Sequence, residues 1–190
     1  MRVGYSELGA LSFIALTFST VQPRLMSSHL SVNIGLILGI TIGLGLFILS
    51  FAISTPSPVN AGFTMLKQTN VIISSSVFLR QTALHLLTAL YEELLWRVCL
   101  QYFVVKYAGF WSGIVIVALL FWLSHLANFA GNRIRAFEFL AFSLLLGLIY
   151  EITLSYPLVV SIHALRNILI IWYRLSLIRK ERFVHENITA

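Results

Sequence analysis

Long apolar stretches constrain the fold of this chain more than any other feature. Crossing the hydrocarbon core of a bilayer takes about 20 mostly apolar residues in a helix, and a helix satisfies all its own backbone hydrogen bonds there. Six such stretches can be drawn, at about 8–21, 31–54, 82–105, 111–128, 136–154 and 157–178. The sequence therefore predicts an all-α fold, a polytopic transmembrane helical bundle of about six spans.

Composition leaves little room for anything outside the membrane. Hydrophobic residues make up 58% of the 190 residues and charged residues only 11%, whereas soluble domains carry about 25% charged residues. A water-exposed surface could not be covered with so few charges. We therefore expect residues 1–190 to form a single membrane domain, with the lipid bilayer as a partner and no nucleic acid.

The basic residues predict the orientation in the membrane, because Lys and Arg gather in cytoplasmic loops. With six spans and the N-terminus inside, only Arg24 and Lys106 would lie outside. The cytoplasmic side would then hold Arg2, Lys67, Arg80, Arg133, Arg135, Arg174, Arg179, Lys180 and Arg182. This bias predicts that both termini are cytoplasmic and that residues 179–190 form a polar cytoplasmic tail. The small size favours the inner or plasma membrane of a prokaryotic cell.

The least apolar internal stretch is 54–81. It opens with TPSP at 55–58, which is typical of a loop. The part at 63–81 could be a span, an interfacial helix, a loop or an extension of the third span, and the sequence does not decide among them.

The third span carries three ionisable residues within the six-residue segment EELLWR, namely Glu92, Glu93 and Arg97. One charged residue at the centre of a membrane helix costs about 2.5–3.5 kcal/mol on insertion scales, so such residues are functional candidates by default. Three in one helix are tolerable only if they face the protein interior and pair there. A polar cluster that only packs helices together is the alternative.

Helix geometry separates the roles of the two acids. Glu93 and Arg97 are four residues apart with the acid first, which is the favourable order for an ion pair. Glu92 lies about 100° further round the helix, where Trp96 and not a cation is its neighbour one turn on. Glu92 is therefore the better candidate for a general base.

Two other spans can bring polar groups to this carboxylate. His125 in the fourth span lies about 20 Å from the outer end, at the same depth as Glu92, when each residue rises about 1.5 Å. His163 and Asn167 in the sixth span share one helix face, at depths of about 9 and 15 Å by the same count. The count permits all four groups to converge without requiring it.

These residues fall into three motifs, each inside a predicted span. They are EExxxR at Glu92–Arg97, FxxxH at Phe121–His125 and HxxxN at His163–Asn167. The motifs, in this order over about residues 82–170, resemble those of the CPBP family, also called the ABI family. That family contains type II CAAX prenyl endopeptidases, bacteriocin-processing and self-immunity proteins, and protein-sorting relatives.

The resemblance implies a glutamic-type intramembrane endopeptidase. Glu92 and His125 would activate a water molecule for attack on a peptide carbonyl. His163 and Asn167 would form the oxyanion hole, donating hydrogen bonds where negative charge develops. A membrane-anchored protein or peptide would be the substrate, in processing, sorting or CAAX-type cleavage.

The same resemblance assigns supporting roles to Glu93, Arg97 and Phe121. We expect no cofactor and no metal, because the sequence lacks an HExxH pair and Asn is a poor zinc ligand. Two His and one Glu could nevertheless hold a zinc ion. Two other functions stay open: a non-catalytic binding or immunity protein with the same fold, and a proton-coupled transporter.

Overall fold

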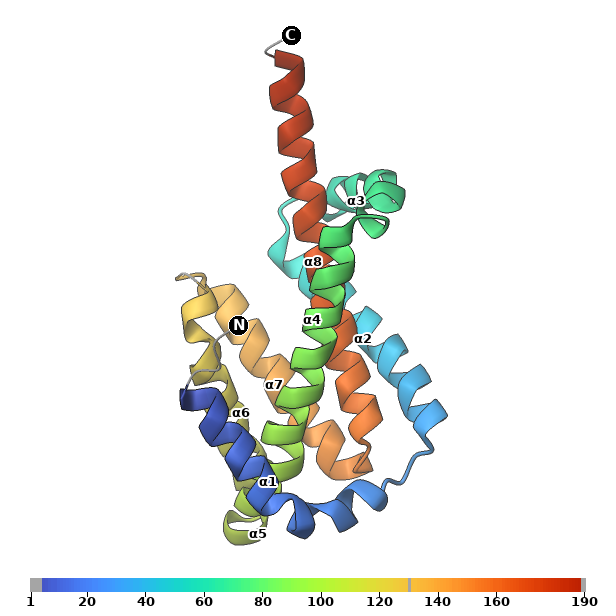
Figure 1. Ribbon diagram of the computed structural model, residues 1–190. Helices are drawn as coiled ribbons and strands as arrows, with labels where there is room; N and C mark the ends of the chain where they lie inside the picture. The colour runs from blue at the N-terminus through green and yellow to red at the C-terminus, as the bar shows by residue number, and fades with distance from the viewer. Residues whose placement is uncertain (1–4, 130, 189–190) are drawn as a thin grey trace. The chain divides into compact units, whose positions relative to one another are not determined.

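A computed structural model describes residues 5–129 and 131–188, and these residues are helical apart from short connections. The elements, labelled in Figure 1, are α1 (Tyr5–Met26), α2 (Val32–Ser54), α3 (Pro58–Ile73), α4 (Ser76–Glu93), η1 (Leu94–Gln101), α5 (Tyr102–Ala108), α6 (Phe110–His125), η2 (Leu126–Phe129), α7 (Arg133–Thr153) and α8 (Tyr156–Ile188). The described part contains no strand, so the prediction of an all-α fold is confirmed.

Four helical stretches in the described part are long and apolar enough to cross a membrane: Val32–Ser54, Phe110–Phe129, Arg133–Thr153 and Tyr156–Ile178. They coincide with four of the six expected spans. The other two expected spans, 8–21 and 82–105, lie in α1 and in the run from α4 through α5. The chain is an integral membrane protein, and a bundle of about six spans agrees with this helix pattern.

The helices group into two compact units, one of residues 1–39 and 90–160, the other of residues 40–89 and 161–190. Each unit is described separately below. The expectation of one membrane domain over the whole chain stays a prediction.

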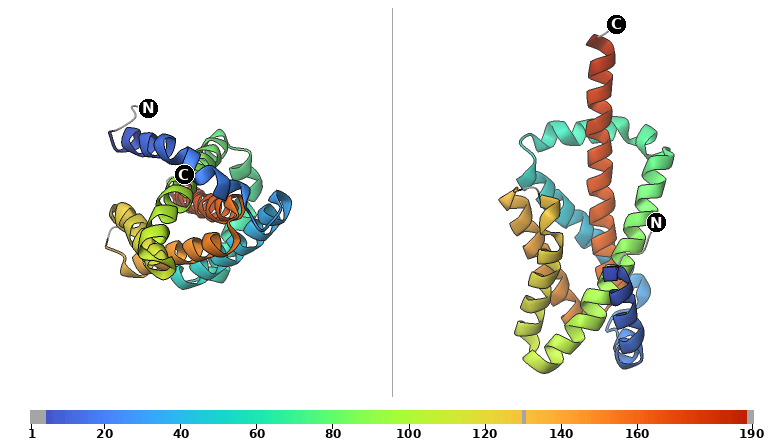
Figure 2. Two further views of the ribbon diagram at one scale, coloured as in Figure 1. Left: turned by 90° about the horizontal axis from the view of Figure 1, so that it is seen from below. Right: turned by 60° about the vertical axis from the view of Figure 1, so that its left-hand side comes forward.

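In the first unit, α5, α6 and α7 run back and forth, each packed against the next (Figures 1 and 2). Gly109 joins α5 to α6 with φ at +90°, a conformation that favours glycine. Gly113 brings the two helices close, since a Cβ there would stand 2.7 Å from the backbone nitrogen of Val105. Asn132 caps α7 by accepting a hydrogen bond from the Arg135 N–H at 3.1 Å, as N-cap residues do.

Between α4 and α5 the helix changes register. Residues 94–101 form the π-helix η1, which begins directly after Glu93. A π-helix pairs each carbonyl with the N–H five residues on, and it is rare outside single turns. The sequence predicts an ordinary α-helix here, because nothing in local composition signals the wider register. The segment η1 packs against α1, α6 and α7.

The second unit contains most of α2, α3, the first part of α4 and most of α8. Phe47, Met65 and Leu169, from three different helices, form its buried apolar cluster. At Gly43 the backbones come close, because a Cβ there would stand 3.1 Å from the carbonyl oxygen of Ile162. The small residue therefore lets α2 lie directly against α8.

The structure also decides the form of the least apolar stretch. Residues 58–73 form the separate helix α3, and α4 then begins at Ser76, ahead of the expected third span. Residues 63–73 are therefore helical, and residues 76–81 extend the helix of the third span. At the other end of the chain, α8 continues in helical form to Ile188, through most of the polar tail.

Candidate active site

Glu92 and His125 meet in the first unit. His125 Nε2, at the end of α6, lies 3.5 Å from Glu92 Oε1 near the end of α4. Their side chains keep 22% and 16% of their surface exposed. The equal depths counted along the two spans permit this contact. The pair is thus close enough to share one water molecule and open enough to receive it.

The other ring nitrogen of His125, Nδ1, has two polar neighbours. It lies 2.9 Å from the carbonyl oxygen of Phe121 and 3.0 Å from Ser124 Oγ, and a carbonyl can only accept a hydrogen bond. An imidazole that donates from Nδ1 to this carbonyl is held with its Nε2 toward Glu92. Because Nε2 and Glu92 Oε1 are 3.5 Å apart, a water that contacts both atoms lies beside the pair and not in line between them.

Glu93 and Arg97 form a second pair with a different environment. Arg97 Nε lies 3.3 Å from Glu93 Oε2, and both side chains are fully buried. Arg97 also donates from an Nη atom to Ser143 Oγ on α7 at 3.1 Å. Its guanidinium lies over the ring of Phe121, 5.0 Å from the centroid, within the range of a cation–π contact. Neighbouring helices thus enclose this pair on several sides.

Phe121 links the two pairs. Its ring is buried and lies 4.6 Å, centroid to centroid, from the imidazole of His125. Phe139 of α7 stands 5.3 Å from Phe121 and 5.0 Å from His125, and Trp96 packs edge-on against Phe121 at 5.5 Å. This aromatic layer separates the enclosed ion pair from the accessible one and fixes the plane of the imidazole.

Sequence reasoning missed Ser143, which gives Arg97 a hydrogen-bond partner from another helix. Ser143 is fully buried, and its own hydroxyl lies 3.4 Å from the carbonyl oxygen of Ala118. A polar residue within the apolar run of the fifth span was the signal that could have identified it. Its partner, however, becomes evident only when α7 is placed against η1.

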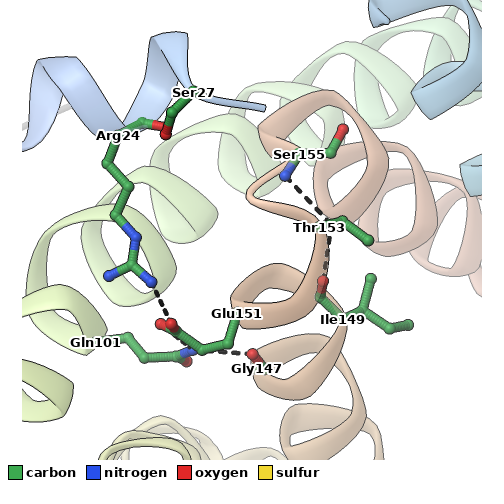
Figure 3. Close-up of polar contacts among 8 residues, drawn as sticks. All are labelled: Arg24, Ser27, Gln101, Gly147, Ile149, Glu151, Thr153 and Ser155. Carbon is green, nitrogen blue, oxygen red and sulfur yellow. Dashed lines mark hydrogen bonds and ion pairs between the residues drawn. The ribbon is translucent and has the colours of Figure 1, made fainter. Parts of the chain in front are cut away.

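A further polar network lies at the other end of η1 (Figure 3). Glu151 of α7 forms an ion pair with Arg24 of α1. Gln101, the last residue of η1, donates from Nε2 to Glu151 Oε1 at 3.0 Å and to the Gly147 carbonyl at 2.9 Å.

His163 and Asn167, the expected oxyanion donors, lie one turn apart on α8 in the second unit. His163 is buried and Asn167 is half-buried. Their spacing on one helix face is as expected from the sequence. Their role stays a prediction, as does the expectation that no metal is required.

Comparison with known proteins gives one match. The family model described as type II CAAX prenyl endopeptidase Rce1-like matches residues 73–169, slightly more than half of the chain. This range contains the three motifs found in the sequence. No curated protein and no solved structure gives a significant match. The match agrees with the resemblance drawn from EExxxR, FxxxH and HxxxN, and the chain belongs to the Rce1-like family of type II CAAX prenyl endopeptidases, a family of intramembrane proteases.

Proposed function

We propose that this protein is a glutamic-type intramembrane endopeptidase that cleaves a membrane-anchored protein or peptide with Glu92 as the general base. The observation that supports it most is the 3.5 Å contact between His125 Nε2 and Glu92 Oε1 in a partly exposed setting. Base catalysis requires a carboxylate that water can reach. Of the two adjacent acids, Glu92 is the accessible one, since Glu93 is fully buried.

In the proposed reaction, a water held by Glu92 and His125 loses a proton to this pair as its oxygen attacks the peptide carbonyl. The carbonyl oxygen gains negative charge, which His163 and Asn167 would stabilise by donating hydrogen bonds. The proton then passes to the leaving nitrogen as the peptide bond breaks. No group other than water is consumed, and the products are a new carboxylate and a new amine.

Glu93 and Arg97 would support the reaction without touching substrate. The buried pair holds α4 and η1 in place, and Arg97 extends the support to α7 through Ser143. Breaking a buried ion pair by removing one partner is strongly destabilising. Their proposed contribution is therefore to the stability and alignment of the helix that carries Glu92.

The excess of basic residues in the predicted inner loops supports an orientation with both termini in the cytoplasm. The family of the chain favours substrates that are anchored in the same membrane. An assay with paired peptides, with and without a prenylated cysteine, determines whether the substrate carries a prenyl group.

The test uses the full-length protein in lipid nanodiscs with membrane-anchored peptides, prenylated and unprenylated, and follows the products by mass spectrometry. Wild type should cleave at least one peptide at a defined bond. Glu92→Gln should lower the rate about 10²–10⁴-fold, the usual contribution of a general base. Glu138→Gln provides the matched control, because it neutralises a half-buried acid of α7 outside both pairs.

Equal cleavage by wild type and Glu92→Gln would refute Glu92 as the general base, and absence of cleavage by wild type would favour a binding or immunity role. A chelator arm tests the metal-free mechanism separately. Activity that is lost with a chelator and regained only with zinc would contradict that mechanism. Replacing Asn167 with Ala should lower the rate about 10²–10³-fold if it is an oxyanion donor.

A further inference from the structure

The π-helix η1 separates Glu92 and Glu93 from the hairpin that carries His125. Eight residues in this register are unusual, because most π-helices are single turns, and these are often found at functional sites. Something must hold the segment against relaxation to the more favourable α register. The structure provides a hydrogen bond with a neighbouring element near each end.

At the start of η1, Tyr156 supplies a donor to the backbone. Its hydroxyl donates to the carbonyl oxygen of Leu90 at 2.7 Å. Leu90 lies in the last turn of α4, which leads directly into η1. The bond therefore ties the helix end that precedes η1 to Tyr156 at the start of α8. In a membrane interior, where water is scarce, such a bond between elements holds the backbone in place.

At the end of η1, Gln101 is fully buried and is held on two sides. Its Nε2 donates to the Gly147 carbonyl and to Glu151, which is in turn paired with Arg24 (Figure 3). Gly147 permits this approach, because a Cβ there would stand 2.9 Å from Gln101 Oε1. The amide of Gln101 thereby ties η1 to α7 and, through the ion pair, to α1.

We propose that Tyr156 and Gln101 are positioning residues for the proposed peptidase reaction, holding the two ends of η1 in π register and so keeping His125 opposite Glu92. The inference rests on the proposed function for its catalytic part. The helix α6 packs against η1, so a register change in η1 moves His125 relative to Glu92. One residue step of an α-helix is about 1.5 Å and 100°, and a misplacement of about 1 Å can lower a rate about 10²-fold.

The test uses Tyr156→Phe, which removes one hydroxyl, and Gln101→Met, which removes the amide at similar length. Each variant should lower kcat about 10–100-fold while KM changes less than about twofold, because a positioning residue acts through η1 and not through contact with substrate. Thr69→Val is the matched control. It removes a half-buried hydroxyl that donates to the Met65 carbonyl at 3.0 Å within α3 of the second unit, and its kcat should stay near wild type.

A second measurement follows η1 itself and does not depend on activity. Cys99, the single cysteine of the chain, is buried within η1, so the rate at which a maleimide labels it reports opening of the segment. Tyr156→Phe and Gln101→Met should label at least about tenfold faster than wild type, as expected when a buried hydrogen bond worth about 1.4 kcal/mol is lost. Thr69→Val should label at the wild-type rate.

Labelling at the wild-type rate in both variants would overturn the claim that these residues hold η1. Faster labelling with an unchanged kcat would overturn the claim that η1 positions the catalytic pair. If wild type cleaves no peptide, the proposed function fails, and the labelling rates alone still decide whether Tyr156 and Gln101 hold the segment.

Discussion

Two adjacent carboxylates, Glu92 and Glu93, occupy contrasting environments. Glu92 faces His125 across 3.5 Å, and both side chains keep part of their surface exposed. Glu93 faces Arg97 across 3.3 Å with no exposed surface on either side chain. One step round a helix separates an accessible acid–base pair from an enclosed ion pair. The difference indicates how one helix can carry both a reactive group and the charge pair that anchors it.

The contrast follows from what packs on each side. Arg97 donates a hydrogen bond to Ser143 of α7 and lies over the ring of Phe121 of α6, so its charge is surrounded by protein. The imidazole of His125 packs against the rings of Phe121 and Phe139. These contacts orient the imidazole so that its Nε2 faces Glu92. We therefore expect mutations of the first pair to act on turnover and mutations of the second to act on stability.

The largest effect is expected at His125. His125→Gln keeps a polar side chain but removes the basic nitrogen that faces Glu92. If the pair activates water, the cleavage rate should fall about 10²–10⁴-fold, while thermal unfolding in detergent stays near that of wild type. A rate within about threefold of wild type would remove His125 from the proposed mechanism.

Removing the cation of the enclosed pair should instead affect folding. Arg97→Leu leaves Glu93 without its cation in a fully buried position, and such a loss typically costs about 3–5 kcal/mol. We expect a large fall in the denaturation midpoint and in the yield of folded protein. Arg97→Lys is the matched control, since it retains the charge and should recover part of the stability. An Arg97→Leu protein as stable as wild type would contradict the structural role.

The smallest of these effects is expected at Ser143. Ser143→Ala removes the hydroxyl that accepts from Arg97 at 3.1 Å, and a hydrogen bond to a charged group is worth about 1.5–3 kcal/mol. Unfolding experiments should show a loss in that range. The cleavage rate of the folded fraction should change little. A strong loss of turnover without a loss of stability would place Ser143 with the accessible pair.

Sequence reasoning predicted the helices and the Glu93–Arg97 pair, and it permitted the contact between Glu92 and His125. Apolar length sets the spans, and a spacing of four residues brings Glu93 to Arg97. Equal depth in two spans allows Glu92 to meet His125. These rules are local, or require only a count of residues along helices. They therefore hold before any detail of the packing is known.

The features that sequence reasoning missed depend on contacts between helices. The π register of 94–101 is accompanied by a hydrogen bond from Tyr156 just before its start and by bonds from Gln101 at its end to α7, and no local pattern signals either contact. The partner of Ser143 depends in the same way on how α7 lies against η1. The form of residues 63–73 was left open because their apolar content is too low for a span, and the packing of Met65 against Phe47 and Leu169 is not visible in the sequence.

The contrast between the two acids is tested most directly by measuring single-turnover cleavage and unfolding for Glu92→Gln and Glu93→Gln side by side. We predict that Glu92→Gln unfolds like wild type but cleaves about 10²–10⁴-fold more slowly. Glu93→Gln should unfold more easily, while its folded fraction cleaves within about tenfold of wild type. A folded Glu92→Gln protein that cleaves normally, beside a stable Glu93→Gln protein that does not, would contradict this account.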